Sequence, residues 1–278
     1  MDFRTEVTIP KAEFTIGPCE RMLFVGSCFA DNIGKLFVAD QFRATVNPYG
    51  VMYNPASILH TVVRYLHATP EGEEAQTAVF TLGTNHVYIL NATGEIVDNC
   101  QKRPQRLFTE RELSIVECEE YLAEAVSLLK ERRPDVHVII TVSPIRYAKY
   151  GFHGSQLSKA TLLLAADRLA HRFDCCTYFP AYEIVCDELR DYRFYADDML
   201  HPSSLAVEYI RERFAQTFFG EATEAFLHEW RPLKAALGHR PLHPESDAYR
   251  SFVSQTRAKI ATLAECYPIS VDLPANGL

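Results

Sequence analysis

The feature of this chain that most constrains its fold is a short apolar run at residues 22–25, which leads directly into a Gly-Ser pair at 26–27. A continuous apolar run of this length is typical of a strand that is buried on both faces. Immediately after the pair, Phe29, Ile33 and Phe37 recur at helical spacing. The stretch therefore predicts a buried strand that passes through a tight turn into an amphipathic helix.

The same alternation of strand and helix signals repeats along the chain. Further strand-like runs lie at residues 43–46, 78–82, 136–142 and 176–179, and helical patterns lie at residues 55–66, 117–133, 162–169, 181–189 and 207–218. A hairpin expected over residues 87–97 is an insertion in this pattern. Strands that alternate with helices pair in parallel, so we predict an α/β fold: a three-layer α/β/α sandwich with a mainly parallel five-stranded sheet.

The end of the chain has a different character. Residues 221–264 are polar and helical in pattern, with a break at residues 238–244. We therefore expect two parts: a sandwich domain over residues 1–220, and a helical C-terminal extension over residues 221–278 that packs on it. With 278 residues and 47% hydrophobic side chains, the chain has enough apolar material for a large core.

Charge and hydropathy exclude two classes of partner. The net charge is −8, from 36 acidic and 28 basic side chains, and no basic stripe occurs along the sequence. Nucleic acid is therefore not an expected partner. No segment approaches the roughly 20 apolar residues that span a bilayer, and the first residues contain no apolar core of a secretion signal. We expect a cytoplasmic protein that does not bind membranes.

The cysteines and histidines do not form a metal-binding pattern. The eight cysteines are scattered without C-x-x-C spacing, which favours reduced thiols. His239 and His243 have an H-x3-H spacing, but Pro241 lies between them and no cysteine pair accompanies them. A solvent-exposed turn is the expected structure there. We predict no metal and no cofactor.

Three side chains have the chemistry of acyl transfer. Ser27 follows the first strand and begins the first helix, where free N–H groups and the helix dipole favour an oxyanion. Asp198 and His201 form a D-x-x-H pattern on a loop before the last patterned helix, and this spacing brings a carboxylate to one imidazole nitrogen. A serine nucleophile needs a base, and the base needs an orienting acid. We therefore predict a catalytic triad of Ser27, His201 and Asp198.

Other interpretations of these residues remain open. Ser27 is also a suitable helix cap. Cys28 is a rival nucleophile because thiolates are intrinsically better nucleophiles than alcohols, and Asp197 competes with Asp198 for the imidazole. At the level of the whole protein, the alternatives to a hydrolase are a non-catalytic binding module with the same fold and an O-acyltransferase with the same acyl-enzyme intermediate.

Residues 26–30 read G-S-C-F-A, the signature of the GSCFA family, which resembles the wider SGNH or GDSL-type hydrolases. Further segments are similar to the same family, namely residues 47–50, 53–57, 80–84, 99–100, 143–146, 158–160 and 192–202. The resemblance implies a flavodoxin-like SGNH fold and a serine esterase. It also implies that Ser27 is the nucleophile and that Asp198 and His201 are its partners.

The resemblance implies an oxyanion hole as well. Its donors would be the backbone N–H groups of Ser27 and Gly50 and the side-chain amide of Asn85. Three positions depart from the family pattern: His86 stands where an aspartate is usual, and Gln101 and Tyr147 each stand where a histidine is usual. The substrate pocket of this chain is therefore expected to differ from those of its relatives.

Three further residues near predicted loop ends are candidates for substrate binding. Arg146 and Arg193 are suited to clamp an anionic group, and Tyr195 is suited to line an acyl or sugar pocket. Surface charge and simple packing explain the same residues. We expect a small-molecule or carbohydrate ester as the substrate, with an O-acetyl ester as the preferred case by family analogy. The sequence does not indicate the oligomeric state.

Overall fold

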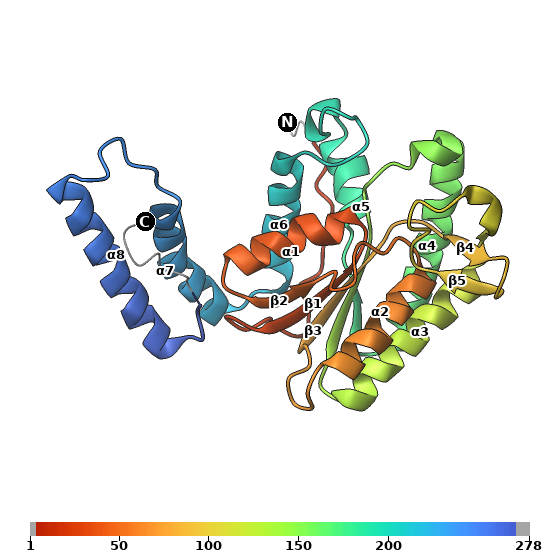
Figure 1. Cartoon of the computed structure of the whole chain (residues 1–278), viewed down its shortest axis with the longest axis horizontal. Helices are drawn as coiled ribbons and strands as arrows, with labels where there is room; N and C mark the ends of the chain where they lie inside the picture. Colours follow the sequence, from red (N-terminus) through yellow and green to blue (C-terminus); the bar gives the residue numbers. More distant parts are fainter. Residues whose placement is uncertain (1–3, 271–278) are drawn as a thin grey trace.

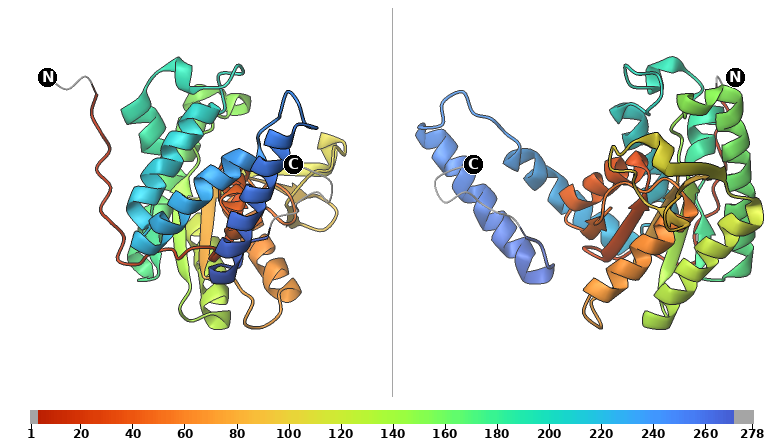
Figure 2. Two further views of the ribbon diagram at one scale, coloured as in Figure 1. Left: turned by 90° about the vertical axis from the view of Figure 1, so that its left-hand side faces the viewer. Right: turned by 45° about the vertical axis from the view of Figure 1, so that its right-hand side comes forward.

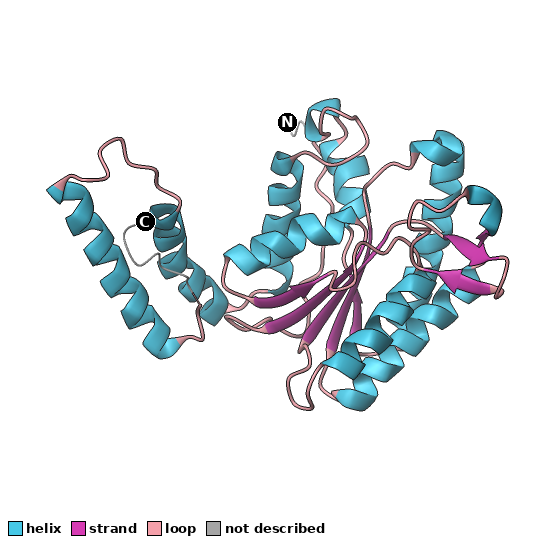
Figure 3. Ribbon diagram, viewed as in Figure 1, coloured by secondary structure: helices cyan, strands magenta, loops and turns pink. Residues whose placement is uncertain are grey.

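The centre of the molecule is a five-stranded sheet in the order β2-β1-β3-β7-β8, in which every neighbouring pair is parallel. The computed structural model describes residues 4–270 and is drawn in Figures 1 and 3. The strands are β1 (Arg21–Gly26), β2 (Arg43–Val46), β3 (Thr77–Leu82), β7 (His137–Val142) and β8 (Cys176–Tyr178). The predicted mainly parallel five-stranded sheet is confirmed.

Helices cover both faces of this sheet, as Figure 1 shows. One face carries α1 (Cys28–Ala39), α5 (Ala181–Glu183) and α6 (Ser204–Phe218), and the other carries α2 (Pro55–Ala68), α3 (Ile115–Arg132) and α4 (Gly151–Arg172). Side chains alternate along a strand, so Phe24 of β1 packs on Phe37 of α1 while Val25 enters the opposite core. The predicted three-layer sandwich is confirmed.

The inserted hairpin is part of a second, smaller sheet. Its strands are β4 (His86–Leu90), β5 (Glu95–Val97) and β6 (Phe108–Glu112), paired antiparallel in the order β5-β4-β6. The sequence predicted the β4–β5 hairpin but not β6. The reason is that β6 reads F-T-E-R-E, with three consecutive charges that hide any strand pattern.

The C-terminal extension is a pair of helices, α7 (Glu221–Leu237) and α8 (Asp247–Cys266). Figure 2 shows that this pair projects from the sandwich. Its attachment lies at the end of α1, where Trp230 donates to the carbonyl of Ala39 over 2.9 Å and Lys234 pairs with Asp40 over 2.8 Å. Asp40 also pairs with the buried guanidinium of Arg211 from α6. The expected C-terminal helices are therefore present, and these contacts hold them to the sandwich.

The strand order indicates where a ligand site is expected. The chain leaves β1 through α1 to reach β2 on one side, whereas β3 lies on the other side of β1. Ligands of open α/β sheets bind outside the carboxyl ends of the strands at this switch in direction. The segments that follow β1 and β3 are therefore the place to look for a site. Within residues 4–270, no helix is long and apolar enough to span a bilayer.

Candidate active site

The turn between β1 and α1 is closely packed against the end of β3. Gly26 has φ +145°, and a Cβ placed on it would lie 2.2 Å from the carbonyl oxygen of Thr81. The N–H of Ser27 donates to that same oxygen over 3.1 Å. Only glycine adopts this backbone with so little space, so the G-S pair of the sequence is needed for the turn itself.

Ser27 caps helix α1. Its hydroxyl oxygen accepts a hydrogen bond from the N–H of Phe29 over 3.2 Å and lies 3.3 Å from the hydroxyl of Thr81. The residue has no exposed surface, at 0%. Capping, one of the two sequence interpretations of Ser27, is thus present in the structure, and the nucleophilic role of Ser27 stays a prediction.

Asp198 and His201 meet as their spacing predicts. The Nδ1 atom of His201 lies 2.5 Å from Oδ2 of Asp198, and Oδ1 of Asp198 accepts from the N–H groups of Leu200 and His201 over 2.9 Å each. The two side chains are 39% and 46% exposed. The backbone N–H groups of His201 and Leu200, and then the imidazole, lower the pKa of Asp198 to about 2. Of the two adjacent aspartates, Asp198 is therefore the one that holds the imidazole.

The second imidazole nitrogen of His201, Nε2, does not contact a carboxylate of the residues that the structure describes. Within residues 4–270, the hydrogen bonds that involve the His201 side chain include neither its Nε2 atom nor Ser27. With Nδ1 committed to Asp198, Nε2 remains available to a reacting group. The structure thus contains the predicted contact between Asp198 and His201. The catalytic role of this pair and its link to Ser27 stay predictions.

The loop after β7 braces the loop that carries Asp198 and His201. The N–H of Arg146 donates to the carbonyl of Leu200 over 3.1 Å, and its guanidinium donates to the carbonyl of Met199 over 3.0 Å. The guanidinium also lies 4.1 Å from the ring centroid of Phe152. Arg146 is therefore positioned to hold the loop, and both of these hydrogen bonds use backbone oxygens of the loop.

Two of the three predicted substrate-binding residues share a pocket. Arg146 and Tyr195 line a cavity of about 340 Å³ near the loop that carries Asp198 and His201. Arg193 is not in its lining: the guanidinium lies over the ring of Phe194 at 5.0 Å and 3.8 Å from Asp191. Arg193 therefore has the surface pairing that the sequence left open as its alternative.

The two further oxyanion donors inferred from the resemblance are engaged in their own loops. The N–H of Gly50 donates to the carbonyl of Asn47 over 2.9 Å in a turn where Gly50 has φ +96°. The amide nitrogen of Asn85 donates to the carbonyl of Leu113 over 2.8 Å, and the residue is buried. The oxyanion roles of Gly50 and Asn85 stay predictions, and these bonds give both groups a structural use.

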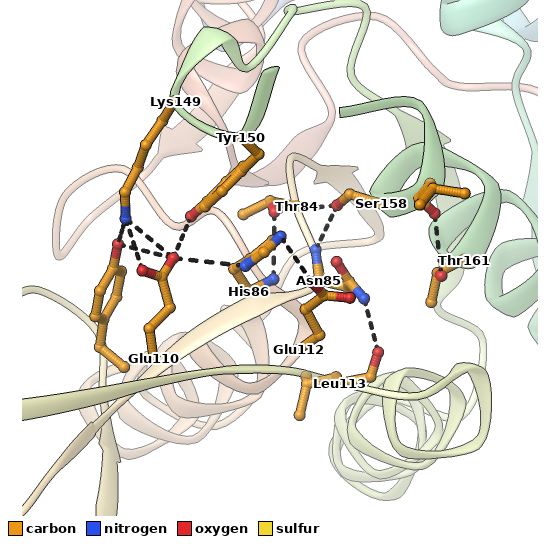
Figure 4. A network of polar contacts seen from close by, with 12 residues as sticks. Thr84, Asn85, His86, Glu110, Glu112, Leu113, Lys149, Tyr150, Ser158 and Thr161 are labelled. Carbon is orange, nitrogen blue, oxygen red and sulfur yellow. Dashed lines mark hydrogen bonds and ion pairs between the residues drawn. The ribbon is translucent and has the colours of Figure 1, made fainter. Parts of the chain in front are cut away.

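Another pocket, of about 350 Å³, lies beside the β1–α1 junction, between the segment after β3, the small sheet and the turn at residues 148–150. Figure 4 shows the polar network at its wall. Glu110 accepts from Tyr150 over 2.7 Å and from Lys149 over 2.9 Å, and Lys149 also contacts the hydroxyl of Tyr88. The ring of His86 stacks on that of Tyr150 at 3.6 Å. We call this cavity the tyrosine pocket, because its lining includes Tyr53, Tyr88, Tyr147 and Tyr150.

Sequence reasoning missed Lys159. Its ammonium group is buried and donates to the carbonyls of Gly83 and Ser143 over 2.7 Å each, which follow β3 and β7. A signal was present: Lys159, Leu162 and Ala166 fall at helical spacing on one face of α4. A lysine on an apolar stripe has a buried partner more often than a free charge.

The part of the chain that the structure describes contains no group of three or more His, Cys, Asp or Glu side chains placed to hold a metal ion. His239, one half of the H-x3-H pattern, instead faces an aromatic side chain, with its ring 5.7 Å from that of Phe252.

Three solved structures are similar to this chain, each at low sequence identity. A catalytic variant of an acetylxylan esterase from Geobacillus stearothermophilus is 14% identical over 73% of this chain and 96% of its own, with a TM-score of 0.46. An alpha/beta hydrolase from the metagenome of Lake Arreo, Spain, is 14% identical over 73% and 96%, with a TM-score of 0.47. A member of the lipolytic G-D-S-L family from Veillonella parvula is 12% identical over 71% and 97%, with a TM-score of 0.47.

Comparison of sequences gives the relationship directly. A search of curated proteins finds no match. The profile of the GSCFA family matches residues 21–75 and 68–214, and a second profile, described as GSCFA domain protein, C-terminal domain, matches residues 230–273. These matches cover most of the sandwich and the C-terminal helices, so the expectation from residues 26–30 is confirmed: the chain belongs to the GSCFA family.

Proposed function

We propose that this chain hydrolyses acyl esters by covalent catalysis, with a nucleophile at the β1–α1 junction, His201 as general base and acid, and Asp198 as the residue that orients His201. The single observation that carries the proposal is the 2.5 Å contact between Asp198 Oδ2 and His201 Nδ1. Arg146, which follows β7, holds the loop of this pair at the carboxyl edge of the sheet. The β1–α1 junction lies at the same edge.

The chemistry of the pair follows from the state of Asp198. Because backbone N–H groups hold the pKa of Asp198 at about 2, its carboxylate stays ionised at every pH used in an ester assay. The carboxylate accepts the Nδ1 proton of His201, so the lone pair of Nε2 is free to take a proton from the nucleophile. The same charge stabilises the imidazolium that then forms.

We assign the alcohol part of the substrate to the tyrosine pocket. Aromatic walls with interleaved polar groups suit a sugar ring, which has apolar faces and hydroxyl edges. The charge of Lys149 in this wall is paired with Glu110 over 2.9 Å, so the pocket favours an uncharged ligand. Tyr53, which lines the pocket, reaches the junction, with its hydroxyl 3.8 Å from the sulfur of Cys28. A small acyl group on a carbohydrate hydroxyl is therefore the substrate that we propose.

The test is turnover by the wild-type protein. Hydrolysis of p-nitrophenyl acetate is followed by absorbance, and acetate release from acetylated xylo-oligosaccharides is followed by chromatography. We expect turnover of both, at rates above those in buffer. A chain that hydrolyses no acyl ester contradicts the proposal and favours a binding module. Transfer of the acetyl group to an added sugar in place of water identifies an acyltransferase instead.

The pocket assignment predicts a selective effect of Tyr88→Ala. Loss of this aromatic wall is expected to raise KM for acetylated xylo-oligosaccharides by about fivefold, since an aromatic contact of this kind contributes about 1 kcal/mol. The KM for p-nitrophenyl acetate is expected to change less than twofold. Steady-state kinetics on both substrates check this, with Phe252→Ala on α8 as a control far from the pocket. Equal rises in KM for both substrates contradict the assignment.

A further inference from the structure

Ser27 and Cys28, the two adjacent residues at the β1–α1 junction, have different surroundings. Ser27 is 0% exposed, and its hydroxyl is occupied by the N–H of Phe29 and the side chain of Thr81. A carbonyl carbon must approach a nucleophilic oxygen to bonding distance, and an atom with no accessible surface offers no such approach. In this structure, Ser27 therefore serves the turn and the helix cap.

Cys28 is more accessible than Ser27. It is the first residue of α1, and its side chain is only partly buried. Its sulfur lies 3.8 Å from the hydroxyl of Tyr53, a 39% exposed side chain that lines the tyrosine pocket. Burial, and next the neighbouring thiol of Cys28, raise the pKa of Tyr53 to about 12. Tyr53 therefore keeps its proton at neutral pH and can donate it in a hydrogen bond to sulfur or to an oxyanion.

Tyr147 lines the tyrosine pocket beside Tyr53. Its hydroxyl oxygen is buried and has no hydrogen-bond partner within residues 4–270. Its ring lies 6.1 Å from that of Tyr53, whose hydroxyl contacts the sulfur of Cys28. Burial raises the pKa of Tyr147, so its hydroxyl keeps its proton at neutral pH. A buried hydroxyl without a partner is costly. A substrate oxygen bound beside Cys28 would give it one.

The loop after β7 connects the group formed by Cys28, Tyr53 and Tyr147 with the proposed acid–base pair. Tyr147 packs edge-on against Tyr53, whose hydroxyl contacts Cys28. The residue before Tyr147, Arg146, donates to the carbonyls of Met199 and Leu200, directly ahead of His201. Two consecutive residues of the segment after β7 thus contact Tyr53 and the loop that carries Asp198 and His201. This segment therefore connects the surroundings of Cys28 with the loop of the proposed acid–base pair.

We propose that Cys28, and not Ser27, is the nucleophile of this protein; the inference rests on the proposed ester hydrolysis. The sulfur of Cys28 attacks the acyl carbonyl carbon as its proton passes to Nε2 of His201, and an S–C bond forms. The C–O bond to the alcohol then breaks, and the alcohol oxygen takes the proton from His201. Water attacks the thioester, gives a proton to His201 and releases the acid. Cys28 recovers that proton from His201 as the S–C bond breaks.

The experiment traps the acyl-enzyme on wild-type protein and then compares variants. Acid quenching during turnover of p-nitrophenyl acetate is expected to leave an adduct of about 42 Da. Peptide mapping is expected to place it on Cys28, and neutral hydroxylamine is expected to remove it, as it does a thioester. Iodoacetamide is expected to inactivate the protein, and Cys266→Ala, which removes an exposed thiol of α8, is expected to leave that inactivation unchanged.

The variants separate the two junction residues. Cys28→Ala is expected to lower kcat by at least about 10³-fold, whereas Ser27→Ala, with its fold checked by circular dichroism, is expected to stay within about tenfold of wild type. An adduct on Ser27 that resists hydroxylamine, or a Cys28→Ala variant with wild-type turnover, overturns this inference and leaves ester hydrolysis intact. A wild-type protein without turnover overturns the proposed function and this inference together.

Discussion

Replacing His201 by alanine is expected to lower kcat/KM for p-nitrophenyl acetate by about 10³-fold. His201 Nε2 is the group that we assign to proton transfer in both halves of the reaction, and a positioned general base contributes about 10² to 10⁴-fold to the rate. The imidazole is also half-exposed, at 39%, so its removal opens no cavity in the core. Steady-state kinetics measure the loss, and thermal unfolding is expected to show a melting temperature close to that of wild type.

A matched control separates the role of His201 from the loss of any histidine. His171 is 78% exposed on α4, where its Nδ1 atom lies 3.5 Å from a carboxylate oxygen of Asp167. His171→Ala is expected to keep wild-type turnover. If His201→Ala retains more than about a tenth of wild-type kcat/KM while the protein stays folded, the assigned base is wrong.

The sequence could predict this fold because its elements carry strong local signals. The apolar run at residues 22–25 and the strand-like run at residues 43–46 are both strands of the sheet. Periodicity identified the helices that cover the sheet, since each buries one face. The contact of Asp198 with His201 was also predictable, because it depends on a three-residue spacing within one loop.

The side chains at the junction could not be predicted in the same way. The sequence shows that Ser27 and Cys28 both follow β1. Which of the two side chains is buried depends on Thr81, which is 54 residues from Ser27 in the chain. Likewise, the amide of Asn85 is occupied by the carbonyl of Leu113, from the end of another strand. Contacts between distant segments are set by tertiary packing, which no local pattern encodes.

Lys159 ties together the two segments that flank the proposed site. Its ammonium group bridges the carbonyls of Gly83 and Ser143 and lies 5.1 Å from the ring centroid of Tyr147. The residue is 2% exposed. Burial, which penalises the charged form, lowers the pKa of Lys159 to about 7. The fold therefore holds a charge-sensitive link between β3 and β7, and this link has a measurable signature in stability.

The stability of the protein is expected to depend on pH through Lys159. In the unfolded chain a lysine has a pKa of about 10.4, so between pH 7 and pH 10 the unfolded state binds one more proton at this site than the folded state. Unfolding free energy must then rise with pH, by about 1.4 kcal/mol per unit from this group alone. The contribution is smallest below pH 7, where Lys159 is charged in both states, and largest near pH 10, where it amounts to a few kcal/mol.

Urea unfolding at several pH values between 7 and 9.5 tests this sign. Other groups titrate in the same range, so the informative quantity is the difference in unfolding free energy between wild type and Lys159→Met. That difference is expected to rise with pH in favour of wild type, because the variant lacks the titrating amine. Lys130→Met, on the exposed face of α3, is expected to show no such trend. A difference that is flat or falls with pH means that Lys159 keeps its proton in the folded state, and the link between β3 and β7 is then an ordinary buried ammonium group.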